Sequence, residues 1–169
     1  MSKIDYIKTL ASLPRVAVES GTFRGQTAIA LPKLFEVVHT IELSDKLFTI
    51  HPKDDRVEWH HGDTRVVLPK LALEIEEPVF WLLDAHYFAG SEAAGKGPLP
   101  LWDELQAISP RKFADVVAVD DVHTFGKKRP REYGGWESVS ANSLMSALGR
   151  VVKHQVIGDM FVMWRSTCT

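Results

Sequence analysis

Residues 16–27 read Val-Ala-Val-Glu-Ser-Gly-Thr-Phe-Arg-Gly-Gln-Thr, and this stretch decides the fold. The pattern predicts an apolar strand that ends in Glu19, a turn through Gly21, and a helix after the second glycine. The next predicted strand, 36–43, carries another acid near its end, Glu42. This order is typical of a nucleotide-binding βαβ unit, because glycine lets the backbone approach a ligand and the acid accepts hydrogen bonds from ribose hydroxyls.

One side chain in the turn indicates which nucleotide would bind. A dinucleotide fingerprint, G-x-G-x-x-G, would place a glycine at position 23, where the backbone meets the pyrophosphate. This chain has Phe23 there, with Arg24 beside it. A bulky side chain at that point suits a ligand without phosphates, such as S-adenosylmethionine, better than NAD. An NAD-dependent oxidoreductase is therefore disfavoured, and an ordinary α/β turn with nothing bound is the remaining alternative.

Composition and charge describe an ordinary globular protein. The 169 residues fit a single domain, 1–169, with 45% hydrophobic and 25% charged residues. A net charge of −2 gives no general attraction to nucleic acid or to an anionic membrane. No apolar run approaches the roughly 20 residues that span a bilayer, and the N-terminus lacks the apolar core of a signal peptide, so we expect a cytoplasmic protein without nucleic-acid or membrane partners. The only cysteine, Cys168, excludes a disulfide framework and a thiolate metal site.

Segments with strand and helix periodicity alternate along the whole chain. Predicted strands lie at 15–20, 36–43, 57–62, 78–84 and 115–119, followed by a hairpin over 154–164. Predicted helices lie at 4–13, 26–35, 44–50, 64–75, 101–108 and 141–151. The alternation predicts an α/β fold: a single Rossmann-like, doubly wound and mostly parallel sheet with a C-terminal antiparallel hairpin.

Acidic residues follow the ends of all five predicted parallel strands. They are Glu19, Glu42, Asp63, Asp84 and the pair Asp120-Asp121. Ligands of an open α/β sheet bind at this edge, where crowded carboxylates are costly unless hydroxyls, amines or a cation face them. Three of these carboxylates, Asp84, Asp120 and Asp121, suit a hard divalent ion such as Mg²⁺. Loop capping by Asp120 and Asp121, with Asp84 bonded to backbone, is the alternative.

The histidines differ in what their positions indicate. His86 lies two residues beyond Asp84 and is a candidate general base at neutral pH, with a structural bond to a loop carbonyl as the alternative. His123 is a second, weaker candidate. Three others lie within predicted strands, where we expect structural roles: His39, His60 and His61.

Five short motifs together resemble the small class I S-adenosylmethionine-dependent methyltransferases. They are Glu-Ser-Gly-Thr-Phe-Arg-Gly, Thr-Ile-Glu-Leu-Ser, Gly-Asp-Thr, Trp-Leu-Leu-Asp-Ala-His-Tyr and Val-Asp-Asp-Val, and the resemblance runs from about Arg15 to the C-terminus. The pattern of Asp84 with Asp120-Asp121 is similar to the metal site of catechol and macrolide-sugar O-methyltransferases. In those families a divalent ion holds two adjacent substrate hydroxyls before methyl transfer.

The resemblance implies a role for each matching residue. One group would line the methionine and ribose, another would hold the ribose hydroxyls and the adenine edge, and Asp84 would lie near the amino-acid tail and the reaction centre. The implied cofactor-binding residues are Glu19, Gly21, Thr22, Gly25, Thr27, Glu42, Leu43, Gly62, Asp63 and Asp84. The implied catalytic residues are His86 and Asp84, and the implied metal ligands are Asp84, Asp120 and Asp121.

Two features depart from the families. Catechol enzymes use a lysine near the first metal aspartate as the base, whereas here the neighbourhood offers His86, which puts a catechol substrate in doubt. Only 14 residues precede the first predicted strand, so we expect the active site to be covered by the 87–100 loop, by the 124–138 loop or by a second subunit of a homo-oligomer. In the second loop, Trp136 could form a wall over a substrate or anchor the loop.

The expected function is methylation of a small-molecule hydroxyl with help from a divalent metal. A module that binds S-adenosylmethionine or a nucleoside without catalysis is the alternative from another class. A nucleic-acid methyltransferase is disfavoured, because Asp-Ala-His-Tyr after the fourth strand does not match the Asn/Asp-Pro-Pro-aromatic motif common in enzymes that act on exocyclic amines.

Overall fold

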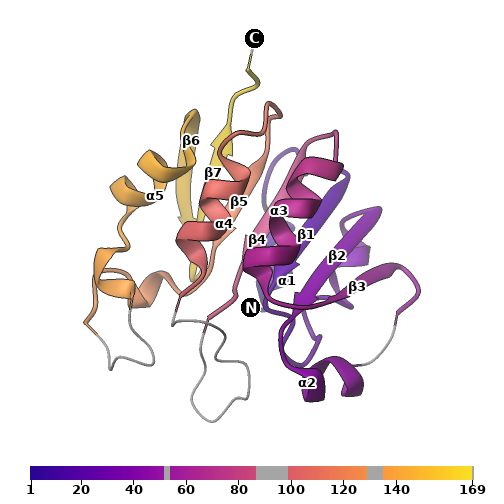
Figure 1. Ribbon diagram of the computed structural model, residues 1–169. Coiled ribbons are helices and arrows are strands. Elements are labelled where there is room, and N and C mark those ends of the chain that lie inside the picture. Colours follow the sequence, from indigo (N-terminus) through magenta and orange to yellow (C-terminus); the bar gives the residue numbers. More distant parts are fainter. Residues whose placement is uncertain (52–53, 87–98, 129–134, 169) are drawn as a thin grey trace.

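A seven-stranded sheet forms the centre of the computed structural model, which describes residues 1–51, 54–86, 99–128 and 135–168 (Figure 1). The strand order is β3-β2-β1-β4-β5-β7-β6, with β1 through β5 parallel and β7 antiparallel to both neighbours. The strands are β1 (Val16–Ser20), β2 (Val37–Glu42), β3 (Val57–His61), β4 (Val79–Leu83), β5 (Val116–Val119), β6 (Val151–Ile157) and β7 (Met160–Arg165). The predicted Rossmann-like sheet with a C-terminal antiparallel hairpin is confirmed.

The central strands are buried on both faces, which explains their continuous apolar sequences. Every residue of β1, β4 and β5 is buried. The strands meet two separate apolar cores, because successive side chains of a strand point to opposite faces. Trp81 of β4, for example, lies in one core and the preceding Phe80 in the other.

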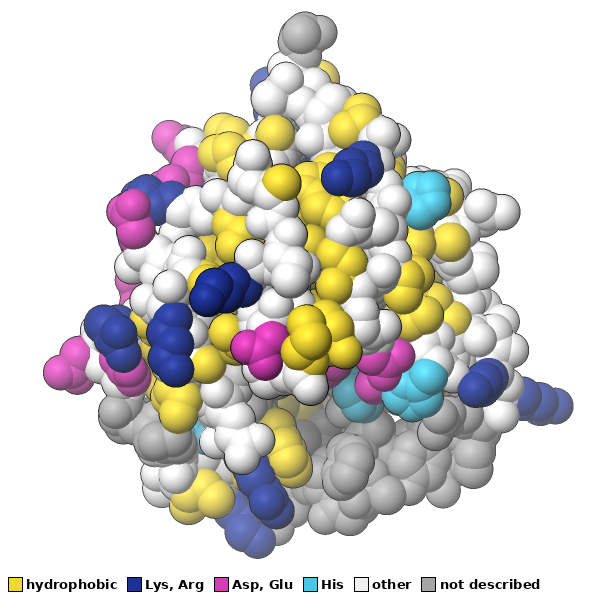
Figure 2. Space-filling model, turned by 180° about the vertical axis from the view of Figure 1, so that it is seen from behind, with side chains coloured by type: hydrophobic (Ala, Val, Ile, Leu, Met, Phe, Trp, Pro, Cys, Tyr) yellow, Lys and Arg dark blue, Asp and Glu magenta, His cyan; other side chains and the backbone are white. Residues whose placement is uncertain are grey.

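Helices cover the two faces of the sheet unequally. One face packs against α3 (Thr64–Glu74), α4 (Leu101–Ile108) and α5 (Ala141–Leu148), which lie in front of the sheet in Figure 1. The other face of the sheet packs against the short helix α1 (Lys3–Ile7) and the 3₁₀ helix η1 (Leu31–Lys33), which is one turn long. Figure 2 shows the molecule from behind, where hydrophobic side chains reach the surface between polar groups. The remaining elements are α2 (Asp45–Ile50), η2 (Val122–Thr124) and η4 (Trp136–Ser138); no helix in the described ranges is long and apolar enough to cross a membrane.

The predicted helix over 26–35 is wrong. The chain there forms turns with isolated helical hydrogen bonds, such as Ile29 N–H to the Gly25 carbonyl at 3.1 Å, and ends in η1. Pro32 lies inside η1, and proline lacks an N–H and disfavours helical geometry in the residue before it. The predicted helix over 4–13 is also shorter, since α1 ends at Ile7 and Ser12 has a φ of +60°.

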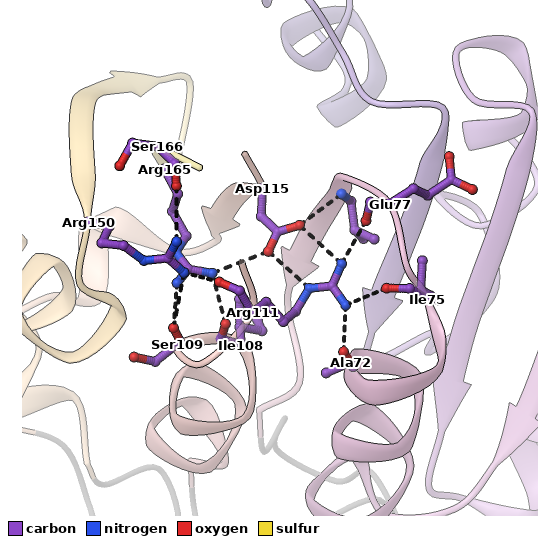
Figure 3. A network of polar contacts seen from close by, with 11 residues as sticks. Ala72, Ile75, Glu77, Ile108, Ser109, Arg111, Asp115, Arg150, Arg165 and Ser166 are labelled. Atoms are coloured by element: carbon purple, nitrogen blue, oxygen red, sulfur yellow. Dashed lines mark hydrogen bonds and ion pairs between the residues drawn. The ribbon is translucent and has the colours of Figure 1, made fainter. Parts of the chain in front are cut away.

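A buried ionic network joins the sheet to its helices at the amino ends of β4 and β5 (Figure 3). The carboxylate of Asp115 accepts hydrogen bonds from Arg111 Nε at 3.0 Å, Arg165 Nη1 at 3.2 Å and the Val79 N–H at 3.0 Å. Arg111 also donates to the carbonyls of Ala72, Ile75 and Glu77, at the end of α3 and beyond it. The network fixes the amino ends of β4 and β5, opposite the acidic carboxyl ends of the strands. It thereby holds the strand register on which the site depends.

Candidate active site

The turn after β1 lies directly against the end of β4. Gly21 has a φ of +83°, and a Cβ built on it would lie 2.7 Å from the carbonyl oxygen of Asp84 and 2.9 Å from Ala85 Cα. Only glycine fits there. Backbone N–H groups of Gly21 and Thr22 donate to the Ile41 carbonyl of β2, so the turn touches both neighbouring strands. The structure therefore brings the predicted glycine turn and Asp84 together.

Glu19 lies at the end of β1 in a chain of buried hydroxyls. Its Oε2 accepts a hydrogen bond from Thr40 Oγ1 at 2.7 Å, and Thr40 Oγ1 lies 2.6 Å from Thr22 Oγ1. The carboxyl is 1% exposed, and this burial raises the pKa of Glu19 to about 7, partly opposed by the Thr40 hydrogen bond. Thr22, predicted to line the ligand, therefore contacts the same hydroxyl as Glu19.

Glu42 is held in place by backbone N–H groups. Phe23 N–H donates to Oε2 at 2.7 Å and Ser44 N–H donates to Oε1 at 2.8 Å. A carboxylate oxygen offers two acceptor positions, so among the described residues each oxygen of Glu42, which is 3% exposed, keeps one position that a ribose hydroxyl could use. The φ of Phe23 is +51°, which is uncommon for a bulky residue, and its N–H donates to Glu42. Leu43, between Glu42 and Ser44, is half-buried.

The predicted adenine-edge residues lie next to Glu42. Gly62 donates its N–H to the Glu42 carbonyl at 2.9 Å. Asp63 is the N-cap of α3: its Oδ1 accepts from Arg65 N–H at 2.9 Å, and its Oδ2 lies 3.4 Å from Arg65 Nη1. Asp63 thus caps α3, with one carboxylate oxygen in an ion pair.

The remaining two predicted cofactor residues, Gly25 and Thr27, lie in the segment that follows the Gly21 turn after β1. Gly25 has a φ of +74° and donates its N–H to the Thr22 carbonyl at 2.9 Å. Thr27 lines a cavity of about 480 Å³ between α1 and the 26–34 segment, which Lys3 and Ser2 also line.

Lys3 is a site residue that the sequence did not indicate. Its ammonium lies 2.6 Å from Asp120 Oδ2 and forms a second ion pair with Asp84. Burial raises the pKa of Asp84 well above its usual range. Burial also disfavours the positive charge of Lys3, but the neighbouring carboxylates of Asp84 and Asp120 favour that charge more strongly. The pKa of Lys3 is therefore raised. Ser2 and Asp5 form a capping box, a sequence signal that could have placed Lys3 in a first helical turn, although not against Asp84, 81 residues away, or the still more distant Asp120.

His86 lies between two carboxylates beyond the ends of β4 and β5. Its Nε2 is 3.1 Å from Asp121 Oδ2 and its Nδ1 is 3.7 Å from Asp84 Oδ1. Burial raises the pKa of Asp121, and His86 opposes that rise. Asp121 has a φ of +60°, a costly conformation for a residue other than glycine and one often found at functional sites. Trp136 is buried and meets the His86 ring edge-on at 5.9 Å, so it anchors its loop beside the imidazole.

The three predicted metal ligands divide into two groups. Asp84, His86 and Asp121 place three ligand atoms within 4.8 Å of one another, whereas Asp120 faces Lys3. A neighbouring group is formed by Asp121, His123 and Asp159, with the His123 N–H donating to Asp159 Oδ1 at 2.9 Å. Asp159, in the β6–β7 turn, was not predicted; the antiparallel hairpin returns it to the edge where the parallel strands end.

The loops expected to cover the site lie largely outside the described residues, which omit 87–98 and 129–134. In the described part of the second loop, Gly126 donates its N–H to the Trp136 carbonyl at 2.9 Å, which closes the base of the loop. Lys127 and Lys128 are exposed there.

Comparison with known proteins connects this geometry to one fold. The sequence matches no protein-family model, and no curated protein matches it significantly. Solved structures that resemble it include human methyltransferase-like protein 13 in complex with SAH, with a TM-score of 0.57 and 14% identity over 92% of this chain and 73% of that one. Two S-adenosylmethionine-dependent methyltransferases also resemble it. The one from Anabaena variabilis has a TM-score of 0.55 and 11% identity over 95% of this chain and 80% of that one. The one from Aquifex aeolicus has a TM-score of 0.54 and 17% identity over 95% of this chain and 87% of that one. At these identities the likeness establishes the fold: the chain has the α/β Rossmann-like fold of class I methyltransferases.

Proposed function

We propose that this chain binds S-adenosylmethionine at the carboxyl ends of β1, β2 and β3 and transfers its methyl group to a hydroxyl of a small molecule. The fold supports the proposal, and so does the fit of the binding residues. Glu42 is oriented by two backbone N–H groups and keeps free acceptor positions, and the Gly21 turn presents backbone rather than side chain beside Asp84. S-adenosylmethionine supplies a methyl group on a sulfonium that is already a good leaving group, so the protein has mainly to align the acceptor and remove its proton.

The observation that carries the catalytic part of the proposal is the position of His86 between Asp84 and Asp121. A neutral imidazole has one N–H, so with carboxylates at both nitrogens one lone pair faces an anion unless a proton or a cation lies there. A hydroxyl that enters this space can give its proton to His86, with Asp121 holding the ring in orientation. Trp136 packs against the ring and limits its rotation.

For a divalent cation, Asp84, His86 and Asp121 are the donor set that the geometry favours. Two carboxylates and an imidazole suit an ion that accepts nitrogen, such as Mn²⁺ or Zn²⁺, better than Mg²⁺, which prefers oxygen ligands. Such an ion, if bound, would lower the pKa of the acceptor hydroxyl and fix its orientation. His86 would then be one of its ligands, so the roles of metal ligand and proton acceptor are alternatives for this imidazole. Asp120 belongs to the neighbouring pair with Lys3, whose ammonium neutralises part of the negative charge at this edge.

The ion pairs of Lys3 support a second candidate function, that of a module that binds S-adenosylmethionine without catalysis. Lys3 already provides a cation for Asp84 and Asp120, so these two acids can be explained as structural. Such a module would have no use for a proton acceptor at position 86.

Methyl transfer from radiolabelled S-adenosylmethionine to a panel of phenols, sugars and hydroxy acids tests the proposal, with His86→Gln and His61→Gln compared. His61 lies at the end of β3 and pairs with Asp45, away from the proposed acceptor position. We expect turnover of at least one acceptor class and a loss of about 100-fold in kcat for His86→Gln, the range for removal of a general base, with the His61 variant unchanged. Equal turnover in both variants would refute the role of His86, and binding without turnover of any acceptor would support the non-catalytic module.

A further inference from the structure

A cluster of metal-ligating side chains lies on β2 and β3, apart from the proposed active site. His39 Nδ1 is 3.1 Å from His60 Nε2 and 3.3 Å from Glu58 Oε2, and all three ligand atoms lie within 4.8 Å of one another. Val38 and Val57 alternate with them and belong to the core on the α1 side, so the cluster faces the side of the sheet that carries α3. Two histidines and one carboxylate thus converge from adjacent strands.

The spacing matches the coordination shell of a small divalent ion. Zinc binds imidazole nitrogens and carboxylate oxygens at about 2.0–2.2 Å, so two ligands of a tetrahedral ion lie about 3.3–3.5 Å apart. Both separations from His39 Nδ1, 3.1 Å to His60 Nε2 and 3.3 Å to Glu58 Oε2, are close to that value. Direct hydrogen bonding explains the arrangement less completely, because a single N–H on Nδ1 serves only one of its two neighbours well.

The surroundings favour the form of the side chains that binds a metal. Burial lowers the pKa of His39 and of His60, and in each case Glu58 and Glu74 partly oppose the shift. His39 is 8% exposed, whereas the Glu58 side chain is 64% exposed and leaves the cluster open to solvent. An ion can therefore enter, and solvent can complete its coordination.

We propose that His39, Glu58 and His60 form a zinc-type divalent cation site that fastens β3 to β2. Among the strands that the structure describes, β3 is at the edge of the sheet with β2 as its only neighbour, and it leads directly into Gly62 and Asp63. An ion held by side chains of both strands would fix the edge strand without taking part in methyl transfer. The site stands on its own geometry and does not depend on the proposed activity.

Calorimetric titration with Zn²⁺ and the visible absorption of bound Co²⁺ test the proposal on the full chain. We expect wild-type protein to bind Zn²⁺ at micromolar or tighter Kd, to give the intense band of four-coordinate Co²⁺, and to gain about 5–10 °C in Tm when free Zn²⁺ is 100 times Kd. Combined with His86→Ala, which removes the other donor set that suits Zn²⁺, His60→Ala should abolish the Co²⁺ band and weaken Zn²⁺ binding at least 100-fold. Glu58→Gln, an isosteric change at an exposed position, should weaken it at least 10-fold without harm to folding.

Two control variants separate this site from others. His61→Ala changes the next residue, which pairs with Asp45 instead, and His86→Ala removes the metal-ligating group beyond β4. Both should keep the Co²⁺ band and the Tm gain. Three results would overturn the proposal. They are the absence of the Co²⁺ band in wild-type protein, its survival in the variant that combines His60→Ala with His86→Ala, and its loss in His86→Ala alone.

Discussion

Glu104 should make the stability of this protein depend on pH near neutrality. It lies on α4, is 1% exposed, and its Oε1 accepts a hydrogen bond from Thr64 Oγ1 at 2.8 Å at the start of α3. Burial raises the pKa of Glu104 to about 7, against the ordinary value of 4.5, and hydrogen bonds from Ser20 and Thr64 oppose part of that rise. The carboxyl is therefore neutral in the folded protein under conditions where it is ionised in the unfolded chain.

The sign and size of the effect follow from this difference. The pKa is raised on folding, so the group's contribution is complete below pH 4.5 and is lost as the pH rises through 7. The difference between 7 and 4.5, at 1.36 kcal/mol for each pKa unit, amounts to about 3 kcal/mol. Glu104→Gln keeps the shape and the acceptor oxygen but cannot ionise. Relative to wild type, its free energy of unfolding should therefore rise by about 3 kcal/mol between pH 4.5 and pH 8.

Urea unfolding of both proteins at half-unit pH steps measures this quantity. Glu76→Gln, at an exposed position, serves as the control and should track the wild type at every pH. Any pH dependence left in Glu104→Gln would include that of Glu19, whose pKa is also raised to about 7. A constant difference between Glu104→Gln and wild type across the range would refute the reasoning, because it would mean that Glu104 titrates alike in the folded and unfolded states.

Three further substitutions test other parts of the structure by urea unfolding. Asp115→Asn should cost about 3–5 kcal/mol, because it leaves two buried arginines without their carboxylate. Gly21→Ala should cost more than Gly126→Ala, since both glycines have a positive φ but only Gly21 would press a Cβ against the backbone after β4; the Gly126 change should cost about 1–2 kcal/mol. Lys3→Met should cost about 3 kcal/mol at pH 8 and less at pH 5, because without the ammonium its two partner carboxylates are relieved only by protonation.

Each of these has a matched control and a refuting outcome. Asp55→Asn changes an exposed aspartate and should leave stability within about 0.5 kcal/mol, so an equal loss at both aspartates would remove the case for the buried network. Equal costs at the two glycines would show that the close approach to β4 is not restrictive. A Lys3→Met loss that grows as the pH falls would contradict the ion-pair account, and Lys8→Met, at an exposed position on the same segment, controls for the loss of a positive charge.

The sheet could be predicted from the sequence because its signals are local. The strand 79–83 is continuously apolar and ends in Asp84, and the glycine turn after β1 requires backbone conformations that other residues rarely adopt. The helix over 26–35 was predicted wrongly, because its apolar spacing was helical while Pro32 and the turns before it prevented a continuous hydrogen-bond ladder.

The contacts within the site could not be predicted, because they join residues distant in sequence. Lys3 lies in α1, 81 residues before Asp84 in the sequence, and no local pattern marks that pairing. Asp120 and Asp121 are adjacent in sequence, yet one faces Lys3 and the other His86, because Asp121 turns into a left-handed conformation. His39 was expected to be structural from its place in a strand; its proximity to His60 depends on the register of β2 against β3.

The proposed function requires first that the carboxyl ends of β1, β2 and β3 bind S-adenosylmethionine. Calorimetric titration with S-adenosylhomocysteine, with NAD as the comparison and with each run repeated in the presence of Mg²⁺, tests it most directly. We expect micromolar binding of S-adenosylhomocysteine to the wild-type protein, at least 10-fold weaker binding to Glu42→Gln, and no binding of NAD. Failure to bind S-adenosylhomocysteine under either condition, or binding of NAD instead, would contradict it.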